Sequence, residues 1–247
     1  MTIINGKYFS KVLNRKKSFV SVLPENINED TKSLVLLHGI QSDETSWILN
    51  TNLEELAETY NIAFHCPAGE NSFYTDHDNG DEFGKALGLE FYEMFHKYFP
   101  LSRKRELNGI AGFSMGGYGA LRLGLKYLSL YSFIGGFSPA LIFYKKYRNE
   151  KHFNKVFSMG LEGSENDVEY LFKNGDNEEL KKTLIRLRCG NDDPLDKYTF
   201  ELYKKIKEID TNMNIKYKQS KGFHDFSIWR EDLYEFLKEL KDIKEEK

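Results

Sequence analysis

The feature that most restricts the fold of this chain is an alternation of strand and helix patterns that begins at residue 34. Short apolar runs, typical of buried strands, are separated by segments in which apolar residues recur at helical spacing. Such alternation predicts a mostly parallel sheet with helices on both faces, which is an α/β fold. The runs expected to form strands are 18–23, 34–37, 62–66, 107–113, 131–137, 184–189 and a more polar run at 215–220.

Two parts of the chain are expected at the edges of this sheet. The part up to residue 23 precedes any helical pattern, and we expect an antiparallel pair there. The run 215–220 alternates between polar and apolar residues, which is typical of an edge strand. Helices are expected at 51–60, where Thr51 and Glu54 have the spacing of a capping box, and at 86–99, 118–127, 198–209 and 226–243.

We expect a single domain over residues 1–247, because no repeat, low-complexity tract or linker interrupts the chain. The segment 140–183 departs from the alternation. It has no strand pattern, several aromatic residues, and glycines at 160, 163 and 175. A segment of this length is too long for an ordinary connection, so we expect a lid-like insertion of helices and loops within the domain.

Charge and composition exclude two classes of partner. The formal net charge is −3 with both signs interspersed, so nothing attracts the chain to nucleic acid or to an anionic membrane. The N-terminus lacks an apolar core of signal-peptide length, and no run approaches a membrane span. We expect a cytoplasmic protein, and a homo-oligomer is compatible with the sequence. Cys66 and Cys189 each end an apolar run and are expected to be buried free thiols rather than a disulfide.

A serine between glycines follows one of the expected strands. The pattern G-x-S-x-G occupies residues 112–116, after the run 107–113 and before a helical run, so a chance match is the weaker interpretation. In a strand–turn–helix elbow the serine sits on a strained backbone, and small neighbours let strand and helix pack closely. A serine hydroxyl is a weak nucleophile that must be presented to a base, and Ser114 is the candidate. The amide of Met115, at the start of the helix, is expected to donate to an oxyanion.

A second oxyanion donor is expected in the turn after the run 34–37. Gly39 turns the chain there, and the amide of Ile40 is the best candidate, with Gln41 as the alternative. We expect His38 to pack at the strand end and shape the turn, because in this order of elements the base follows the nucleophile.

The base and the acid are expected on the loops after the last two strands, because functional groups of such sheets lie on loops that leave the carboxyl ends of strands. Of six histidines, His224 is the candidate base, since it follows the last expected strand and precedes the final helix. Asp192 and Asp193 follow the preceding strand, and both are candidate acids. Pro194 forces Asp193 towards an extended conformation, so the two carboxylates should point apart. Asp193 is favoured, partly on the family resemblance described below.

The other acidic residues near these loops have structural interpretations. Asp196 is expected to cap the helix that follows it, and Asp225 is expected to form hydrogen bonds within its loop. The acidic run 76–82 superficially resembles a calcium loop, but glycine occupies a ligand position and the turn glycine is misplaced. We therefore predict no metal site and no cofactor.

The chain resembles the esterase family that includes tributyrin-type esterases and S-formylglutathione hydrolases, on the α/β-hydrolase fold. The matching segments are LLHGIQSDETSW, SFYTD, GFSMGGYGALRLGL, CGNDDPLD and GFHDFSIW, of which GxSMGGxGA is the most specific. The tributyrin-type branch matches best, because Phe223 stands where S-formylglutathione hydrolases usually place an aspartate. The resemblance implies a catalytic triad with two backbone oxyanion donors, namely Ser114 as nucleophile, Asp193 as acid, His224 as base, and the amides of Ile40 and Met115.

The predicted activity is that of a serine carboxylesterase, which hydrolyses a small-molecule ester through an acyl-enzyme; the resemblance implies a short acyl chain. An S-formylglutathione hydrolase or other thioesterase, and an acyltransferase on the same fold, are the alternatives, and a non-catalytic binding module is the weakest interpretation. Aromatic residues near the strand ends are expected to line the acyl pocket, although each could equally belong to the core. The candidates are Trp47, Tyr74, Phe143 and Trp229.

Overall fold

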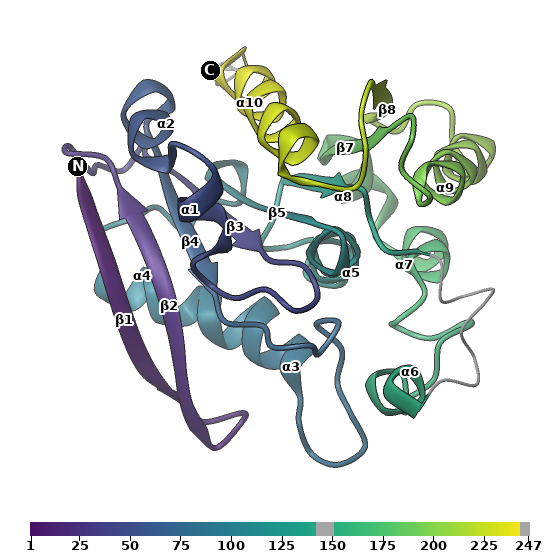
Figure 1. Ribbon diagram of the computed structural model, residues 1–247, viewed down its shortest axis with the longest axis horizontal. Coiled ribbons are helices and arrows are strands. Elements are labelled where there is room, and N and C mark those ends of the chain that lie inside the picture. The colour runs from purple at the N-terminus through teal and green to yellow at the C-terminus, as the bar shows by residue number, and fades with distance from the viewer. Residues whose placement is uncertain (142–150, 243–247) are drawn as a thin grey trace.

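All the strands in the described part of the chain belong to one sheet. The computed structural model describes residues 1–141 and 151–242. The sheet has eight strands in the order β1-β2-β4-β3-β5-β6-β7-β8 (Figure 1). The strands are β1 Thr2–Ser10, β2 Arg15–Leu23, β3 Lys32–Leu37, β4 Ile62–Pro67, β5 Asn108–Phe113, β6 Phe133–Phe137, β7 Leu184–Gly190 and β8 Ile215–Ser220.

The strand directions agree with the sequence pattern. From β4 across to β8 every neighbouring pair is parallel, whereas β1 with β2 and β2 with β4 are antiparallel. The edge strand predicted at 215–220 and the antiparallel pair predicted for the part up to residue 23 are therefore confirmed. The sequence analysis gave bounds to only one strand of that pair, 18–23, and none to β1. The residues of this outer strand before Ser10 are exposed or only partly buried, which leaves a weak apolar pattern.

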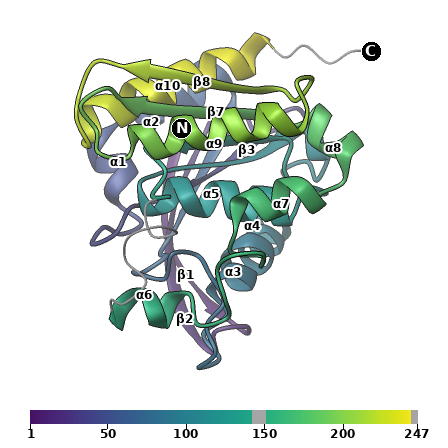
Figure 2. The same cartoon turned by 90° about the vertical axis from the view of Figure 1, so that its right-hand side faces the viewer.

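Helices cover both faces of the sheet (Figures 1 and 2). Along β3, Val35 and Leu37 pack in one hydrophobic cluster and Leu34 and Leu36 in another, as alternation on a strand requires. The helices are α1 Ser46–Asn50, α2 Leu53–Tyr60, α3 Phe83–Lys85, the π-helix η1 Ala86–Glu90, α4 Phe91–Tyr98, the 3₁₀ helix η2 Arg105–Leu107, α5 Met115–Lys126, α6 Lys151–Val156, α7 Val168–Asn174, α8 Asn177–Lys182, α9 Asp196–Ile209 and α10 Phe226–Asp242. The first cluster includes residues of α4, α5, α7 and α9, and the second includes residues of α1, α2 and α10.

The capping box predicted at residue 51 is wrong. Thr51 ends the short helix α1, where its hydroxyl donates to the carbonyl of Trp47 at 2.5 Å, and α2 begins only at Leu53 after Asn52. A threonine hydroxyl can bond a carbonyl four residues earlier as readily as an amide ahead of it, and here the preceding helix takes it.

The described part of the segment 140–183 contains α6, α7 and α8 and no strand, as expected. Buried hydrogen bonds anchor it on α5. The hydroxyl of Tyr118 donates to the carbonyl of Asn166 at 2.7 Å, and Nε of Arg122 donates to the side-chain oxygen of Asn166 at 2.8 Å. A lid function for this segment stays a prediction.

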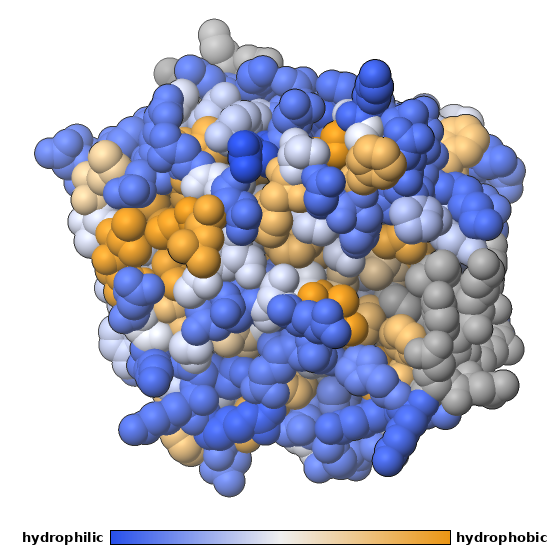
Figure 3. Space-filling view, viewed as in Figure 1, coloured by the Kyte–Doolittle hydropathy of each residue, from blue (hydrophilic) through white to orange (hydrophobic). Residues whose placement is uncertain are grey.

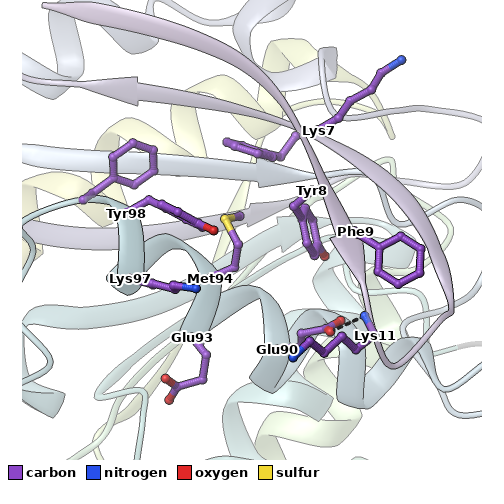
Figure 4. A pocket seen from close by; sticks show the side chains of 11 residues that line it. Lys7, Tyr8, Phe9, Lys11, Glu90, Glu93, Met94, Lys97 and Tyr98 are labelled. Carbon is purple, nitrogen blue, oxygen red and sulfur yellow. Dashed lines mark hydrogen bonds between the residues drawn. The ribbon is translucent and has the colours of Figure 1, made fainter.

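A groove runs between the outer strand β1 and helix α4 (Figure 4). Its volume is about 610 Å³, and its lining includes Tyr8, Met94 and Tyr98 with Lys and Glu side chains around them. None of the residues predicted to form the functional site lines this groove.

The expected free thiols are confirmed, because Cys66 and Cys189 are both unpaired and buried. Among the described helices, none combines the length and the apolar character needed to cross a bilayer.

Strand β5 and helix α5 approach each other so closely that only glycine fits at two positions. A Cβ atom on Gly112 would lie 2.4 Å from the carbonyl oxygen of Gly116, and a Cβ on Gly116 would lie 2.3 Å from that of Leu37. Both clashes are with backbone, which cannot swing aside as a side chain can. This packing holds the start of α5 against the ends of β3 and β5.

We predict that Gly116→Ala lowers the free energy of unfolding by about 3 kcal/mol, because the added methyl group forces strands and helix apart. Gly124→Ala, in the same helix, is the matched control. The nearest atoms to its Cβ would belong to side chains, namely Cδ1 and Cγ1 of Ile134 at 2.6 and 2.7 Å and Cγ2 of Ile110 at 3.1 Å, and these can shift more readily than backbone. Alanine also has the higher helix propensity, so the loss should be smaller, about 1 kcal/mol. Urea unfolding followed by circular dichroism measures both, and equal losses would contradict this account of the packing.

Candidate active site

The structure brings Ser114, His224 and Asp193 together from three loops. Ser114 lies between β5 and α5, Asp193 follows β7, and His224 lies between β8 and α10. The Oγ atom of Ser114 is 2.9 Å from Nε2 of His224, and Nδ1 of His224 is 2.7 Å from Oδ2 of Asp193. Parallel strands end at the same edge of a sheet, so segments up to 110 residues apart in sequence meet there.

The carboxylate of Asp193 is buried and surrounded by donors. Its Oδ1 atom accepts from the amide of Leu195 at 2.8 Å, and its Oδ2 atom faces His224. Burial acts to raise the pKa of Asp193, but hydrogen bonds from His224 and the Leu195 amide outweigh it and hold the pKa below its usual value. The ionised carboxylate fixes the proton on Nδ1 of the imidazole, so Nε2 is left to accept from Ser114.

The backbone of Ser114 is held in an unusual conformation, with φ 56° and ψ −118°. Its N–H donates to the carbonyl of Phe137 at 2.9 Å, and its own carbonyl accepts from the amides of Tyr118 and Ala140 at 3.1 and 3.0 Å. These bonds on both sides hold the strained residue in place. The side chain of His224 is 31% exposed, so solvent and ligands can reach the hydroxyl–imidazole pair.

The two predicted oxyanion donors have unoccupied N–H groups. Neither the amide of Ile40 nor that of Met115 donates a hydrogen bond to any residue in the described part of the chain. The amide of Gln41, the alternative to Ile40, donates to Oδ1 of Asn71 at 2.8 Å, which leaves Ile40 as the better placed of the two. The Met115 amide also lies at the N-terminus of α5, where the helix dipole adds positive potential.

The acidic residues near Asp193 in the sequence have environments that differ from its own. Asp192 is exposed, and the carboxylate that reaches His224 is that of Asp193. The prediction that Asp196 caps α9 is wrong, because Leu195 precedes the helix and Asp196 is its first residue. The side chain of Asp196 instead accepts from Tyr217 and Gln219 on β8, a contact between elements that the local pattern does not reveal.

Two smaller predictions are confirmed. Asp225 forms hydrogen bonds within its loop, accepting from the amide of Ser227 at 2.8 Å. His38 is 1% exposed and shapes the turn after β3, because its Nε2 atom accepts from the amide of Gly69 at 2.8 Å while Nδ1 faces the Gly39 carbonyl at 2.8 Å. Burial lowers the pKa of His38, which keeps the ring neutral in that role.

Of the aromatic residues predicted to contact substrate, two lie in the core and one lies beside His224. Trp47 and Tyr74 have no appreciable exposed surface and support the turn after β3 from the core, with Trp47 Nε1 donating to Leu37 O at 3.1 Å and the Tyr74 hydroxyl donating to His38 O at 2.9 Å. These two side chains therefore have no surface to offer a ligand. The ring of Trp229 stands edge-on to that of His224, with centroids 4.9 Å apart. Phe143 lies outside the described residues.

Two residues near the site were missed by the sequence analysis. Asn71 occupies the Gln41 amide, and the sequence offers no pattern that marks it. Ser138 accepts a hydrogen bond from Nε1 of Trp229 at 3.1 Å, and its position directly after an expected strand, at the functional edge of the sheet, could have drawn attention to it.

No group of three or more metal-capable side chains occurs within residues 1–141 and 151–242. The face of the molecule in Figure 3 is mostly hydrophilic, with separate apolar patches.

Comparisons with known proteins give a consistent family assignment. The Esterase family model matches residues 10–240. An acetyl esterase from Caldicellulosiruptor saccharolyticus is 32% identical over 268 residues, which cover 98% of this chain and all of that protein. Among solved structures, the fluorophosphonate-binding serine hydrolase FphF of Staphylococcus aureus has a TM-score of 0.87 at 24% identity, covering 98% of both chains. The S-formylglutathione hydrolase FrmB of the same organism has a TM-score of 0.84 at 24% identity, covering 98% of this chain and 99% of that one. These neighbours have the α/β-hydrolase fold, as predicted.

A second buried carboxyl group lies on α10, three residues after Trp229. Asp232 is 1% exposed, and its Oδ2 atom has no hydrogen-bond partner among the described residues. Burial raises the pKa of Asp232 to about 7; the positive charges of Arg188 and Lys218 oppose this, and the negative charges of Glu231 and Asp193 add to it. The folded protein therefore holds this proton more tightly than the unfolded chain does.

We predict that Asp232→Asn makes the protein relatively more stable as the pH rises. The pKa of Asp232 is higher in the folded protein than in the unfolded chain, so protonation of this group adds to the free energy of unfolding. This contribution is fully present below about pH 4, decreases as the pH rises and is lost once the pH passes 7, a total change of about 4 kcal/mol. Asparagine does not titrate, so the stability difference between variant and wild type should grow between pH 4 and pH 8. Urea unfolding at several pH values measures it, with Asp192→Asn as the exposed control, and a pH-independent difference would contradict the prediction.

Proposed function

The chain belongs to the esterase family, and from this premise we propose that it hydrolyses short-chain acyl esters through a serine–histidine–aspartate triad and an acyl-enzyme intermediate. The observation that carries the proposal is the unbroken hydrogen-bond chain from the Ser114 hydroxyl through His224 to the buried carboxylate of Asp193. A binding module needs neither a strained serine nor an ionised carboxylate behind an accessible imidazole, so the geometry favours catalysis.

Acylation begins when Oγ of Ser114 attacks the ester carbonyl carbon and Nε2 of His224 takes its proton. Asp193 stabilises the imidazolium that forms. The carbonyl oxygen becomes an oxyanion, which the amides of Ile40 and Met115 bind, each contributing about 3 kcal/mol to transition-state stabilisation. The intermediate then collapses, the bond to the alcohol oxygen breaks, and His224 protonates the leaving alcohol. Ser114 now carries the acyl group.

Deacylation repeats the same steps with water. The oxygen of a water molecule attacks the acyl carbon while His224 removes a proton from that water. The amides of Ile40 and Met115 bind the second oxyanion. Collapse of this intermediate releases the carboxylic acid, and the proton on His224 returns to Oγ of Ser114. An alcohol in place of water would give acyl transfer, so the choice of acceptor decides between the esterase and the acyltransferase interpretation.

The proposed substrate is a small ester with a short acyl chain. The curated relative that is 32% identical over 98% of this chain is an acetyl esterase, which supports this substrate class. Phe223, next to His224, is 65% exposed, and Ile40 is 40% exposed, so apolar side chains flank the candidate site. Such a rim suits an uncharged alcohol better than the charged glutathione peptide. A thioester stays the second candidate, because the same attack and the same oxyanion apply to it.

We predict that the wild type releases p-nitrophenol from its acetate and butyrate esters and that Ser114→Ala reduces kcat/KM about a thousandfold or more, because no other group forms the acyl-enzyme. Ser33→Ala is the control, since Ser33 is another buried serine and its hydroxyl has no partner among the described residues. Comparable turnover by Ser114→Ala would refute the proposed nucleophile. Faster turnover of S-formylglutathione than of the acetyl ester would replace the ester by the thioester as the substrate class.

The two adjacent aspartates provide a matched test of the acid. We predict that Asp193→Asn lowers kcat about a thousandfold, because the amide no longer holds the imidazole tautomer that accepts from Ser114. Asp192→Asn removes a neighbouring exposed carboxylate and should leave kcat within about twofold of wild type. A larger loss at Asp192 than at Asp193, in the same p-nitrophenyl acetate assay, would assign the acid to Asp192.

A further inference from the structure

Ser138 lies directly after β6 and touches the residues around the proposed acid. It is 0% exposed, and its φ of 46° is in the left-handed region. Its hydroxyl oxygen is 3.1 Å from Nε1 of Trp229 on α10 and 3.6 Å from Sγ of Cys189 on β7. One buried hydroxyl thus joins side chains of two other elements.

The chemistry of these partners determines which atom donates. The indole N–H of Trp229 can only donate, and the thiol of Cys189 acts here as a weak donor, so both use lone pairs of the Ser138 oxygen. The Ser138 hydroxyl therefore acts here as an acceptor, and the bond from the indole N–H is the stronger of the two.

Trp229 connects this hydroxyl to the base and to the nucleophile's strand. Its ring stacks on Phe113, the residue before Ser114, with centroids 4.3 Å apart and an interplanar angle of 18°. The same ring stands edge-on to the imidazole of His224 at 4.9 Å and 87°. An indole held by Ser138 at its nitrogen is therefore fixed as a wall beside the imidazole.

We propose that Ser138 is a positioning residue for the reaction: its hydroxyl accepts a hydrogen bond from the indole N–H of Trp229 and so fixes that ring beside His224. This inference rests on the proposed esterase function. Ser138 does not touch the reacting atoms and acts only through Trp229.

The backbone conformation supports a role for the hydroxyl itself. A residue with a side chain in the left-handed region is strained by about 1 kcal/mol or more, whereas glycine is not. The N–H of Ser138 donates to the carbonyl of Arg188 at 2.7 Å, a bond that glycine could form equally well. The turn therefore has no need of a serine side chain, whereas the indole N–H of Trp229 uses its hydroxyl as an acceptor.

The test compares Ser138→Ala with Ser138→Gly. Both remove the hydroxyl, but glycine also relieves the backbone strain, so a role of the hydroxyl requires similar losses in both. We expect kcat for p-nitrophenyl acetate to fall about tenfold in each, with KM unchanged, because the ground-state binding surface is intact. Ser33→Ala should keep wild-type kcat. Wild-type kcat in the glycine variant would overturn the proposal, and that variant serves the test even if the alanine variant fails to fold.

A double-mutant cycle separates positioning from general destabilisation. In a Trp229→Phe background the indole N–H that Ser138 binds is gone, so adding Ser138→Gly should lower kcat by less than twofold. A further tenfold loss in that background would show that Ser138 acts on the fold at large, and the proposal would be wrong. If the wild type itself hydrolyses no ester or thioester, the proposed function fails and not the role of Ser138 alone; if it is active and the Ser138 variants match it, only the positioning role fails.

Discussion

The geometry of the candidate site depends on the backbone of Ser114 being held in the left-handed region at the junction of β5 and α5. Such a conformation costs about 1 to 3 kcal/mol in isolation. Here the amide of Ser114 is bonded to Phe137 on β6 and its carbonyl to the amides of Tyr118 and Ala140, while Gly112 and Gly116 let strand and helix approach closely. The hydroxyl is therefore directed out of the turn, towards the imidazole rather than into the helix.

The parallel sheet places the other residues of the candidate site next to Ser114. β5, β6, β7 and β8 are consecutive neighbours, and each is followed at its carboxyl end by one polar residue of the candidate site or its support. These residues are, in strand order, Ser114, Ser138, Asp193 and His224. The candidate oxyanion donor Ile40 follows β3 on the other side of β5. Groups far apart in sequence meet because their strands share one edge.

This regularity explains how much could be predicted from the sequence. Ser114 and His224 could be proposed from the G-x-S-x-G pattern and from their places after expected strands, because loops at the carboxyl ends of parallel strands meet at one edge of a sheet. The choice of Asp193 over Asp192 also depended on the family resemblance. The failures concern contacts between elements that no local pattern records. Asp196 accepts from β8 instead of capping its own helix. Trp47 and Tyr74 have the composition of a pocket wall, but their polar atoms bond backbone carbonyls in the core.

The buried charge of Asp193 links the candidate site to the packing of two strands. Burial opposes ionisation of the carboxyl group, and the hydrogen bonds that counter it come from the imidazole of His224 and from the Leu195 amide. The imidazole reaches Asp193 because β7 and β8 are neighbouring parallel strands. Without this donor, a carboxyl group that stayed buried would have a higher pKa, and it would no longer orient the imidazole. Proton acceptance at Nε2 therefore depends on the packing of these two strands.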